Sequence, residues 1–433
     1  MTEAVRHANP LIDSFVEGKA IDVDVEEKKI KVELNSLLEG IKEGDPPTVD
    51  ISYDHLVVAV GNKVADTDVP GAATRCLRLK SCEDARRLRT ALGECFEYAS
   101  RPDVQNAEAR EERSRRVTLV VVGGGATGVE LAGELSDFLE DITRPRVGAY
   151  PRLRDDVKVV LVHGGDELLP QFDADLRHEA LRALKKHGVD VRLNTRVSEV
   201  QDGAVILSTK VLDENGVPTG EREESVQPMG LCAWCAGIAP VPFVDKLLQK
   251  LPETAKGHGG RVNVDRWLRP PMPSEELRGS ILVLGDAASL QSRKNSLLPQ
   301  TAQVAGQQGA YLGRLLVRGY DLSAELPSLP STSSLSNSSS TDSAMATWLK
   351  FRNLEVAPGF SFLNLGLLAY LGGGKALSQI QIGDVPIFSY AGSVAFVLWR
   401  SVYLVKQVAT RNRVLVTFDW IKSALFGRDI TRL

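Results

Sequence analysis

The sequence is poor in cysteine and holds no long apolar run free of charges. Its five cysteines among 433 residues are sparse and odd in number, which argues against a secreted fold held by disulfides. No such run reaches the roughly 20 residues of a membrane-spanning helix, and no secretory or transit peptide is visible after Met1. The net charge of −4 argues against broad nucleic-acid binding. These absences leave a globular protein with two or three domains.

The most informative stretch runs from Val117 to Leu139 and reads VTLVVVGGGATGVELAGELSDFL. Val117–Val122 predicts a strand buried on both faces of a parallel sheet. Gly123, Gly125 and Gly128 follow with the spacing G-x-G-x-x-G, and an apolar helix face comes next. The first glycine permits a tight turn, the second lets the backbone approach a pyrophosphate, and the third lets the helix pack closely. This order predicts dinucleotide binding; the alternative is a glycine-rich turn without a ligand.

The next predicted strand, Val157–Val162, is followed by a helix over Asp173–Lys186. An acidic residue normally ends this strand and bonds the adenosine ribose. Here the residue is His163, then two glycines and Asp166. A neutral histidine can accept a hydrogen bond and a protonated one could meet a 2′-phosphate, so NADH and NADPH both stay open. The plainer alternative is an exposed loop residue.

A second set of signals surrounds two further buried strands. Within Tyr53–Asn62, a predicted strand ends at Gly61. The second strand, Ile281–Leu284, is followed by Gly285 and Asp286. A carboxylate at this edge of a parallel sheet can bond a ribityl hydroxyl of a flavin, although Asp is also a preferred helix N-cap. Leu297–Leu316 then predicts a helix starting near a proline, with small residues that allow close approach to a planar ring.

Four other segments have simpler interpretations. Val23–Leu34 and Ile51–Val60 predict strands on either side of a polar turn. Arg75–Ala99 predicts one amphipathic helix, and the charge run Asn106–Arg116 predicts a solvated surface loop. The remaining expectation concerns the cysteines. A strand places the sulfurs of Cys232 and Cys235 on opposite faces, so packing is favoured over redox chemistry, and core or surface thiols are expected at Cys76, Cys82 and Cys95.

The C-terminal part differs in composition from the rest. A Ser-rich linker or insertion, Leu326–Ala344, precedes an apolar segment, Phe360–Ile380, with a glycine turn. Apolar residues then recur at helical spacing in two segments: Val394, Leu398, Val402, Val405 and Val408, and then Val414, Phe418, Ile421 and Leu425. Lys and Arg outnumber Asp and Glu there, which favours two amphipathic helices on a membrane surface. The alternative is a helical hairpin packed on the body or on a second subunit.

Together, these motifs resemble those of the type II NADH:quinone oxidoreductases, the rotenone-insensitive alternative NADH dehydrogenases of mitochondria. The resemblance is carried by VVVGGGATGVELAGEL, the strand end Ala59–Gly61, LVLGDAAS, LLPQTAQVAGQQ, and the tail from LGLLAYLGGGKALSQI to FDWIKSALFGRDI. The matches keep the family's order from about Phe15 to the end. The tail discriminates best, because other two-dinucleotide flavoproteins lack it.

The resemblance implies an α/β fold with two Rossmann-like domains, the first incomplete, and a C-terminal amphipathic helical membrane-anchoring region. The FAD domain would cover residues 1–85 and 266–325, with the NAD(P)H domain at 86–265. A linker would follow at 326–345 and the membrane-anchoring region at 346–433. The implied reaction passes electrons from NADH, or NADPH, through FAD to a ubiquinone-like quinone without proton pumping. The implied location is the mitochondrial inner membrane, peripherally, on an anionic surface, as a homodimer.

The resemblance also assigns roles to single residues. Those implied to bind NADH are Gly123, Gly125, Gly128, His163 and Gly237. Those implied to bind FAD are Gly61, Gly285, Asp286, Thr301 and Ala302. Those implied to line the quinone site are Gln303, Gly306, Trp399 and Tyr403. The residues implied to act in catalysis are Glu130 and Gln303.

Departures from the family pattern keep other functions open. Residues 1–54 hold no G-x-G-x-x-G motif for the FAD pyrophosphate, which suggests an incomplete sequence. His163 replaces the acidic ribose residue, and Gly306 stands where mitochondrial relatives often carry histidine. No calcium loop is present, and no metal site is expected. The alternatives are a non-catalytic, membrane-peripheral nucleotide-binding remnant, and a soluble dithiol–disulfide flavoenzyme of the same superfamily.

Overall fold

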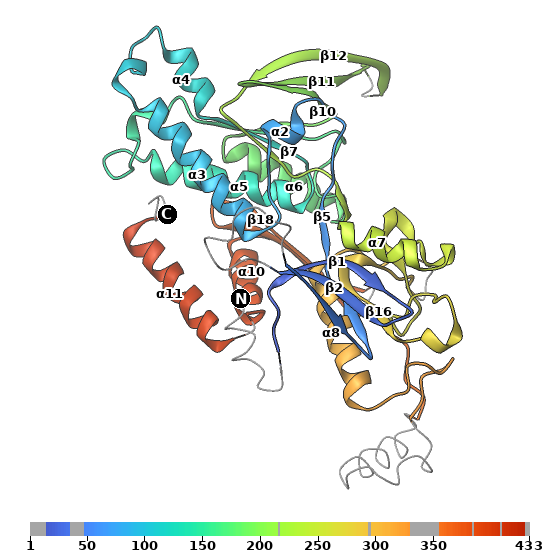
Figure 1. Ribbon diagram of the computed structural model, residues 1–433. Helices are drawn as coiled ribbons and strands as arrows, with labels where there is room; N and C mark the ends of the chain where they lie inside the picture. Colours follow the sequence, from blue (N-terminus) through green and yellow to red (C-terminus); the bar gives the residue numbers. More distant parts are fainter. Residues whose placement is uncertain are drawn as a thin grey trace. The chain divides into compact units, whose positions relative to one another are not determined.

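The chain folds into two compact units, each built from two separate segments. The computed structural model describes residues 14–34, 47–214, 217–292, 296–329, 355–382, 385–407 and 409–428. The first unit comprises Met1–Lys63 and Ile238–Asn364, and the second comprises Val64–Gly237 and Leu365–Leu433 (Figure 1). Residues 64–85 and 365–433 therefore belong to the unit that contains the glycine-rich stretch.

The core of the second unit is a five-stranded parallel sheet. Its strands, in spatial order, are β6 (Leu77–Arg78), β13 (Leu231–Trp234), β7 (Thr118–Val122), β8 (Lys158–Val162) and β9 (Val189–Arg192). All five residues of β7 are buried, as expected of a strand with helices on both faces. The helices that share its core are α3 (Cys82–Ala99), α5 (Ala126–Ile142) and α6 (Ala174–Lys186). The predicted order of strand, glycine turn and helix is thus confirmed.

The second unit also contains an antiparallel three-stranded sheet. Its strands are β10 (Thr195–Gln201), β11 (Ala204–Leu212) and β12 (Pro218–Pro228). Strand β12 pairs antiparallel with β11, from Pro228 opposite Ala204 to Pro218 opposite Leu212. The short helix α2 (Ala72–Arg75) also lies in this unit.

Two predictions for the region before the glycine turn were wrong. The helix expected over Arg75–Ala99 starts only at Cys82, because Ser81 caps it by accepting the Asp84 N–H at 3.1 Å. The preceding residues form β6. The charge run expected to be a solvated loop contains α4 (Arg110–Arg116). Its Arg113 pairs with Asp156 at 2.6 Å, with both side chains largely buried, so part of the run is anchored to the body.

The first unit contains smaller sheets. The antiparallel strands β1 (Gly18–Asp24), β2 (Lys29–Leu34) and β3 (Thr48–Ser52) form one sheet. The single strand predicted over Val23–Leu34 is interrupted by a turn, where Lys28 has φ +51°. The other strands described in this unit are β4 (Leu56–Val58), β14 (Ile238–Pro240), β15 (Val262–Asn263), β16 (Ile281–Val283) and β17 (Ala288–Ser289). The short strand β5 (Asn62–Val64) spans the boundary at Lys63. Among the described residues of this unit, the α-helices are α7 (Pro242–Lys250) and α8 (Ala302–Val317).

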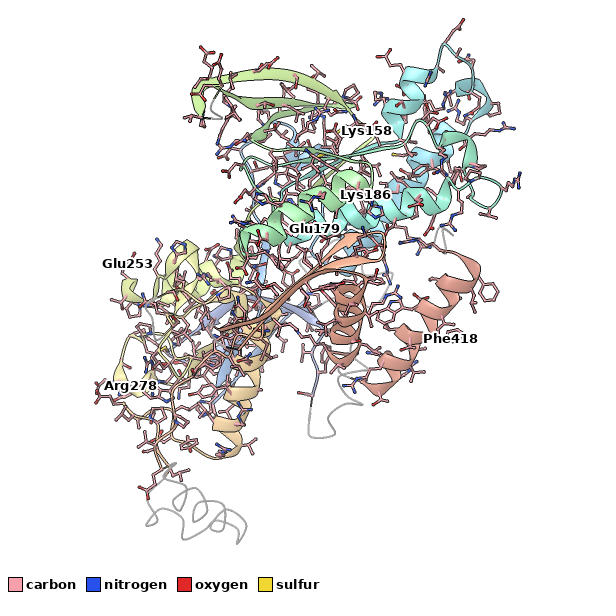
Figure 2. All side chains as sticks on the ribbon, turned by 180° about the vertical axis from the view of Figure 1, so that it is seen from behind. Lys158, Glu179, Lys186, Glu253, Arg278 and Phe418 are labelled. Atoms are coloured by element: carbon pink, nitrogen blue, oxygen red, sulfur yellow. The ribbon has the colours of Figure 1, made fainter. Side chains whose placement is uncertain are left out.

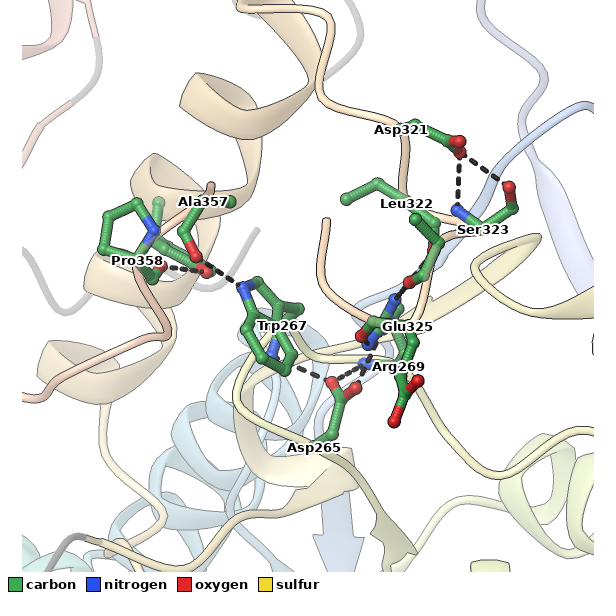
Figure 3. Close-up of polar contacts among 11 residues, drawn as sticks. Asp265, Trp267, Arg269, Asp321, Leu322, Ser323, Glu325, Ala357 and Pro358 are labelled. Atoms are coloured by element: carbon green, nitrogen blue, oxygen red, sulfur yellow. Dashed lines mark hydrogen bonds and ion pairs between the residues drawn. The ribbon is translucent and has the colours of Figure 1, made fainter. Parts of the chain in front are cut away.

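Arg269 ties its own loop to the segment that precedes residues 330–354, which lie outside the described ranges. Its buried guanidinium donates to the carbonyl oxygens of Leu322, Ala324 and Glu325 at 2.6–3.0 Å and to the Asp265 carboxylate at 2.8 Å. Figure 3 shows Arg269 among Asp265, Leu322 and Glu325. Beyond the gap, the chain re-enters beside the segment it left, because the Leu329 N–H donates to the Glu355 carbonyl. Most of the predicted Ser-rich linker lies outside the described residues.

The C-terminal segment packs on α5 in the second unit. It forms an antiparallel sheet of β18 (Leu367–Gly372), β19 (Lys375–Ile382) and β20 (Val385–Gly392), followed by α10 (Ser393–Val405) and α11 (Thr410–Phe426). The two helices were predicted; the sheet was not. A Cβ on Gly133 of α5 would lie 2.6 Å from the carbonyl carbon of Leu371, so this glycine lets β18 approach the helix backbone. None of the helices in the described residues is both long and apolar enough to cross a membrane.

Candidate functional site

The glycine turn between β7 and α5 has the geometry of a dinucleotide-binding turn. Gly123 has φ +122°, a region that favours glycine. A Cβ on Gly128 would lie 1.9 Å from the Gly123 carbonyl oxygen, so only glycine allows the helix this close to the turn. Gly125 precedes the first residue of α5, its side-chain position is open space, and no side chain caps the helix. The backbone N–H groups at this end of the helix can therefore receive a phosphate.

His163 follows β8 and lies against this turn. Its Nδ1 accepts the Gly124 N–H at 3.1 Å, which requires the proton of a neutral ring to sit on Nε2. Burial lowers the pKa of His163. A hydrogen bond to the Glu167 backbone and the charge of Asp166 raise it, but by less. The histidine is therefore held neutral and positions the glycine turn, and the exposed-loop alternative is wrong.

The end of β13 closes the other side of the turn. A Cβ on Gly123 would lie 3.0 Å from the backbone of Cys235, and Gly237 has φ +80° with its carbonyl accepting the Ala65 N–H. Burial raises the pKa of the Cys235 thiol to about 12. Cys232 faces away, and a hydrogen bond between its free thiol and that of Cys76 lowers the pKa of the Cys76 thiol. The C-x-x-C pair is therefore part of the packing, as predicted. The contact between Cys232 and Cys76 was not predicted, because Cys76 follows α2 and lies far from Cys232 in the sequence.

Glu130, on the second turn of α5, meets an aromatic cluster from the C-terminal segment. Its carboxylate accepts the Tyr370 N–H at 3.2 Å, and burial raises its pKa. Tyr370 stacks on Trp399 with ring centroids 5.3 Å apart, and Tyr403 lies 4.6 Å from Trp399. The buried indole N–H of Trp399 makes no hydrogen bond of good geometry, but its proximity to Glu130 still lowers the carboxyl pKa. The structure thus brings together Glu130, Trp399 and Tyr403.

Sequence reasoning missed three residues that build or anchor this cluster: Tyr370, Asp137 and Phe396. The Tyr370 hydroxyl donates to Asp137 of α5, which also accepts the Gly373 N–H at 2.7 Å. Phe396 completes the cluster, with its ring 5.3 Å from that of Tyr370. The signal available was an aromatic residue just before the Gly372–Gly374 turn, but nothing in the sequence showed that α5 was its partner.

The predicted flavin residues lie at one edge of the first unit. Strands β4 and β16 run parallel, with Val58 opposite Val283, so their carboxyl ends carry Gly61 and Gly285 to the same side. Both glycines have positive φ, +70° and +68°. Asp286 lies in the short 3₁₀ turn Gly285–Ala287 and does not begin an α-helix, so the N-cap alternative is wrong. Its carboxylate lies near Arg261. Burial lowers the pKa of the Arg261 guanidinium, and the charge of Asp286 partly offsets this by raising it.

The start of α8 faces the same edge. Gln308 of α8 accepts the Gly285 N–H at 2.7 Å, and the Gln300 side chain donates to the Asp286 carbonyl at 2.9 Å. Thr301 caps the helix by accepting the Val304 N–H, so Ala302 and Gln303 are its first residues. The helix thus starts three residues after the proline where its start was expected. Nothing lies within 4 Å of a Cβ placed on Gly306 or Gly61, which leaves open space beside both glycines.

Two family profiles match this chain and show the protein class to which it belongs. The profile of the pyridine nucleotide-disulphide oxidoreductases matches residues 3–309, and that of the NDH2 C-terminal domain matches residues 364–429. The chain belongs to the type II NADH dehydrogenase family, whose members pass electrons from NADH to ubiquinone.

Individual relatives agree with this placement. A probable mitochondrial NADH-ubiquinone oxidoreductase of Schizosaccharomyces pombe is 34% identical over 99% of this chain and 72% of its own length. The external NADH-ubiquinone oxidoreductase 2 of Saccharomyces cerevisiae is 30% identical over 96% of this chain and 69% of its own. The structure of NDH2 from Plasmodium falciparum with NADH is 20% identical, with a TM-score of 0.74 over 96% of this chain and 84% of that one, and shares the fold.

Proposed function

We propose that this protein oxidises NADH and reduces a ubiquinone-like quinone, with FAD between them, at a mitochondrial membrane. The balanced reaction is NADH plus a proton plus quinone, giving NAD⁺ and quinol. The observation that carries the proposal is the position of α5, which starts at the glycine turn and carries Glu130 beneath the aromatic cluster of the C-terminal segment. Relatives named as mitochondrial NADH-ubiquinone oxidoreductases support the same reaction and location.

The second unit, with the glycine turn, is the proposed NADH-binding part. Gly123, Gly125 and Gly128 would bring backbone N–H groups to the pyrophosphate, and the open space at Gly125 fits this role. Gly237 would border the path of the nicotinamide. His163 would support the turn through Gly124.

The first unit is the proposed FAD-binding part. Gly61, Gly285 and Asp286 at one sheet edge, with Thr301 and Ala302 at the start of α8, fit the ribityl chain and ring of a flavin. Bound FAD supplies the two-electron acceptor that a hydride from NADH requires. Asp286→Ala should remove a charge-assisted hydrogen bond of roughly 1.5–3 kcal/mol and lower the FAD content after dialysis. Full FAD retention in this variant, measured by absorbance, would exclude the role.

The quinone side is assigned to residues of α8 and of the C-terminal segment. Gln303 and Gly306 on α8 would face the quinone path, and Trp399 and Tyr403 would line its entrance. Glu130, whose pKa is raised by burial, would lie beside the aromatic cluster and could exchange a proton there. Each assignment is open to substitution tests with quinone and ferricyanide as alternative acceptors.

The C-terminal helices are proposed to lie on an anionic membrane surface. Their apolar side chains are unusually exposed: Phe418 is 65% exposed, Leu425 71% and Phe426 83% (Phe418 is labelled in Figure 2). Lys and Arg on the same helices would add attraction to anionic lipid, on the order of 1 kcal/mol each near the surface. These two features are those of an interfacial helix.

The membrane proposal can be tested without disturbing the core. The double variant Phe418→Ser/Leu425→Ser removes two exposed apolar groups, each contributing roughly 1.5–3 kcal/mol when buried, so vesicle binding should fall at least about tenfold. The matched control is Val317→Ser on α8, which is 85% exposed and should bind like the parent. Unchanged sedimentation of the double variant with cardiolipin vesicles would contradict the proposal.

A homodimer is the remaining part of the proposal. The exposed apolar residues on α10 and α11 offer more surface than a lone soluble domain usually shows. Light scattering in mild detergent should give twice the chain mass of 47.1 kDa. A single-chain mass would contradict the dimer while leaving the enzyme assignment intact.

The direct test of the function uses the purified protein with bound flavin. NADH oxidation should depend on added ubiquinone and should yield quinol in equal amount. A protein with flavin that reduces disulfides but no quinone would favour the dithiol–disulfide alternative. A protein that binds nucleotide but holds no flavin would favour the non-catalytic alternative.

A further inference from the structure

The end of β8 carries a cation beside the place where the adenosine ribose of a dinucleotide is expected. In the fold of the second unit, a carboxylate here bonds the ribose diol, whereas a nearby arginine accommodates a 2′-phosphate. The chain has His163, Gly164 and Gly165 at this strand end. His163 is not the required cation, because its Nδ1 accepts the Gly124 N–H and its pKa is lowered.

Arg196, near the start of β10, lies directly against this strand end. The loop and β10 are joined by backbone hydrogen bonds: the Thr195 N–H donates to the His163 carbonyl at 2.9 Å, and the Asn194 N–H donates to the Gly165 carbonyl at 2.7 Å. A Cβ on Gly164 would lie 3.0 Å from Cγ and 3.2 Å from Nε of Arg196. The arginine stem therefore follows the bare backbone of Gly164.

The guanidinium of Arg196 is available for a ligand. The side chain is exposed, and no hydrogen bond or ion pair involves it within the described residues. Of the two acidic residues on the loop, Glu167 already pairs with Arg177, while Asp166 is exposed. Arginine recognises phosphate through a planar fork of donors, so this position suits a dianionic ligand better than a ribose diol.

We propose that Arg196 binds the 2′-phosphate of NADPH, so that NADPH is a substrate of this protein alongside NADH. Gly164 contributes by leaving room for the arginine stem, and His163 by holding the glycine turn without adding a carboxylate. The inference rests on the proposed function, because it requires the dinucleotide to occupy the glycine turn. The competing assignment is that Asp166 bonds the ribose diol, which would select NADH.

The test compares two small probes that differ by the 2′-phosphate. Binding of 2′,5′-ADP and 5′-AMP is measured by calorimetry at fixed ionic strength on the full chain, with NADPH and NADH kinetics in parallel. Arg196→Gln should weaken 2′,5′-ADP binding about 10- to 100-fold, as expected for the removal of a charge-assisted hydrogen bond. The same variant should bind 5′-AMP with an affinity within about twofold of the parent protein's, because only the 2′-phosphate meets the arginine. Its ratio of kcat/KM for NADPH over NADH should fall. Arg196→Lys should keep part of the affinity, because the charge stays while the planar fork of donors is removed.

The control is Arg182→Gln on α6, which makes the same charge change at an exposed position paired with Glu179. It should leave both probes unaffected. Suppose that 5′-AMP binds, but that 2′,5′-ADP binds no more tightly, or that Arg196→Gln leaves the difference in affinity unchanged. The arginine subsite is then excluded and the proposed function stands. If 5′-AMP binds and Asp166→Asn weakens it, Asp166 is the ribose contact and the proposal is overturned. If neither probe binds the parent protein, the nucleotide site itself is excluded, and this inference with it.

Discussion

Helix α5 presents two different kinds of contact, one at its start and one along its side. At its start, the backbone of Gly123, Gly125 and Gly128 forms the turn, and side chains contribute almost nothing. Along its side, Glu130 and Asp137 receive hydrogen bonds from the C-terminal segment. The first contact belongs to the proposed NADH site and the second to the proposed quinone side. A change at either contact should therefore affect one half of the reaction before the other.

The largest effect is expected where the helix meets the turn. In Gly128→Val, the new side chain would collide with the Gly123 carbonyl, because even its Cβ would be 1.9 Å from that oxygen. Backbone shifts of this kind cost about 1–3 kcal/mol or more, and they would displace the phosphate-binding N–H groups. We expect loss of NADH oxidation with every acceptor, measured with ubiquinone and with ferricyanide.

The control for this change is a glycine with free space around it. Gly313 of α8 has no neighbour within 4 Å of its Cβ position. Gly313→Ala should retain both activities and gain up to about 1 kcal/mol in unfolding free energy, because alanine favours a helix. Retained NADH oxidation in Gly128→Val would show that the turn tolerates a wider spacing than the geometry allows.

A smaller effect is expected along the side of α5. Asp137→Ala removes the acceptor for the Tyr370 hydroxyl and the Gly373 N–H, which should lower the unfolding free energy by about 1–3 kcal/mol. Tyr370→Phe removes one of these two bonds and should show a smaller decrease. Denaturant unfolding measures both, and equal stability of the Asp137→Ala variant and the parent would refute the anchoring role.

A pH effect should follow from Glu130. Its folded-state pKa is raised from 4.5 by burial, so the folded protein holds this proton more tightly than the unfolded chain does. This contribution to stability is present below pH 4.5 and is lost as pH rises through the raised pKa. Glu130→Gln should remove that part of the pH dependence while its amide oxygen keeps accepting the Tyr370 N–H. Parallel stability curves for the two proteins above pH 4.5 would argue against the shift.

The smallest effect is expected at the end of the C-terminal segment. Arg428 pairs with Glu134 and with Asp141, the latter at 3.0 Å, near the surface of α5. Surface pairs of this kind contribute about 0.2–1 kcal/mol each, so Arg428→Met, which removes two of them, should lower the unfolding free energy by about 0.4–2 kcal/mol. The difference should shrink further at high salt. A loss larger than that of Asp137→Ala would reverse the proposed ranking of the two interactions.

The sequence predicted what depends on local backbone requirements. The turn at Gly123, the strand before it and the apolar face of α5 are all encoded within neighbouring residues. The role of Gly133 could not be predicted, because its missing side chain makes room for β18, which is distant in the sequence. The contact between Glu130 and Tyr370 could not be predicted either, because the two residues are 240 positions apart. The start of α3 is encoded locally by Ser81 and Asp84, which form a capping box. The partner of Arg113 is not encoded locally, because Asp156 comes from a distant segment.

The most direct test of the account is Gly133→Val, which acts on the side of α5 and spares its start. Its Cβ would lie 2.6 Å from the backbone of Leu371 and so push β18, with the aromatic cluster, away from Glu130. The measurement is the ratio of ubiquinone reduction to ferricyanide reduction at saturating NADH. We predict that the ratio falls at least about tenfold while ferricyanide reduction stays within about twofold of the parent, because the change disturbs an interaction that only quinone reduction requires. If both rates stay at the parent level, or if both are abolished together, the separation of the two functions along α5 is contradicted.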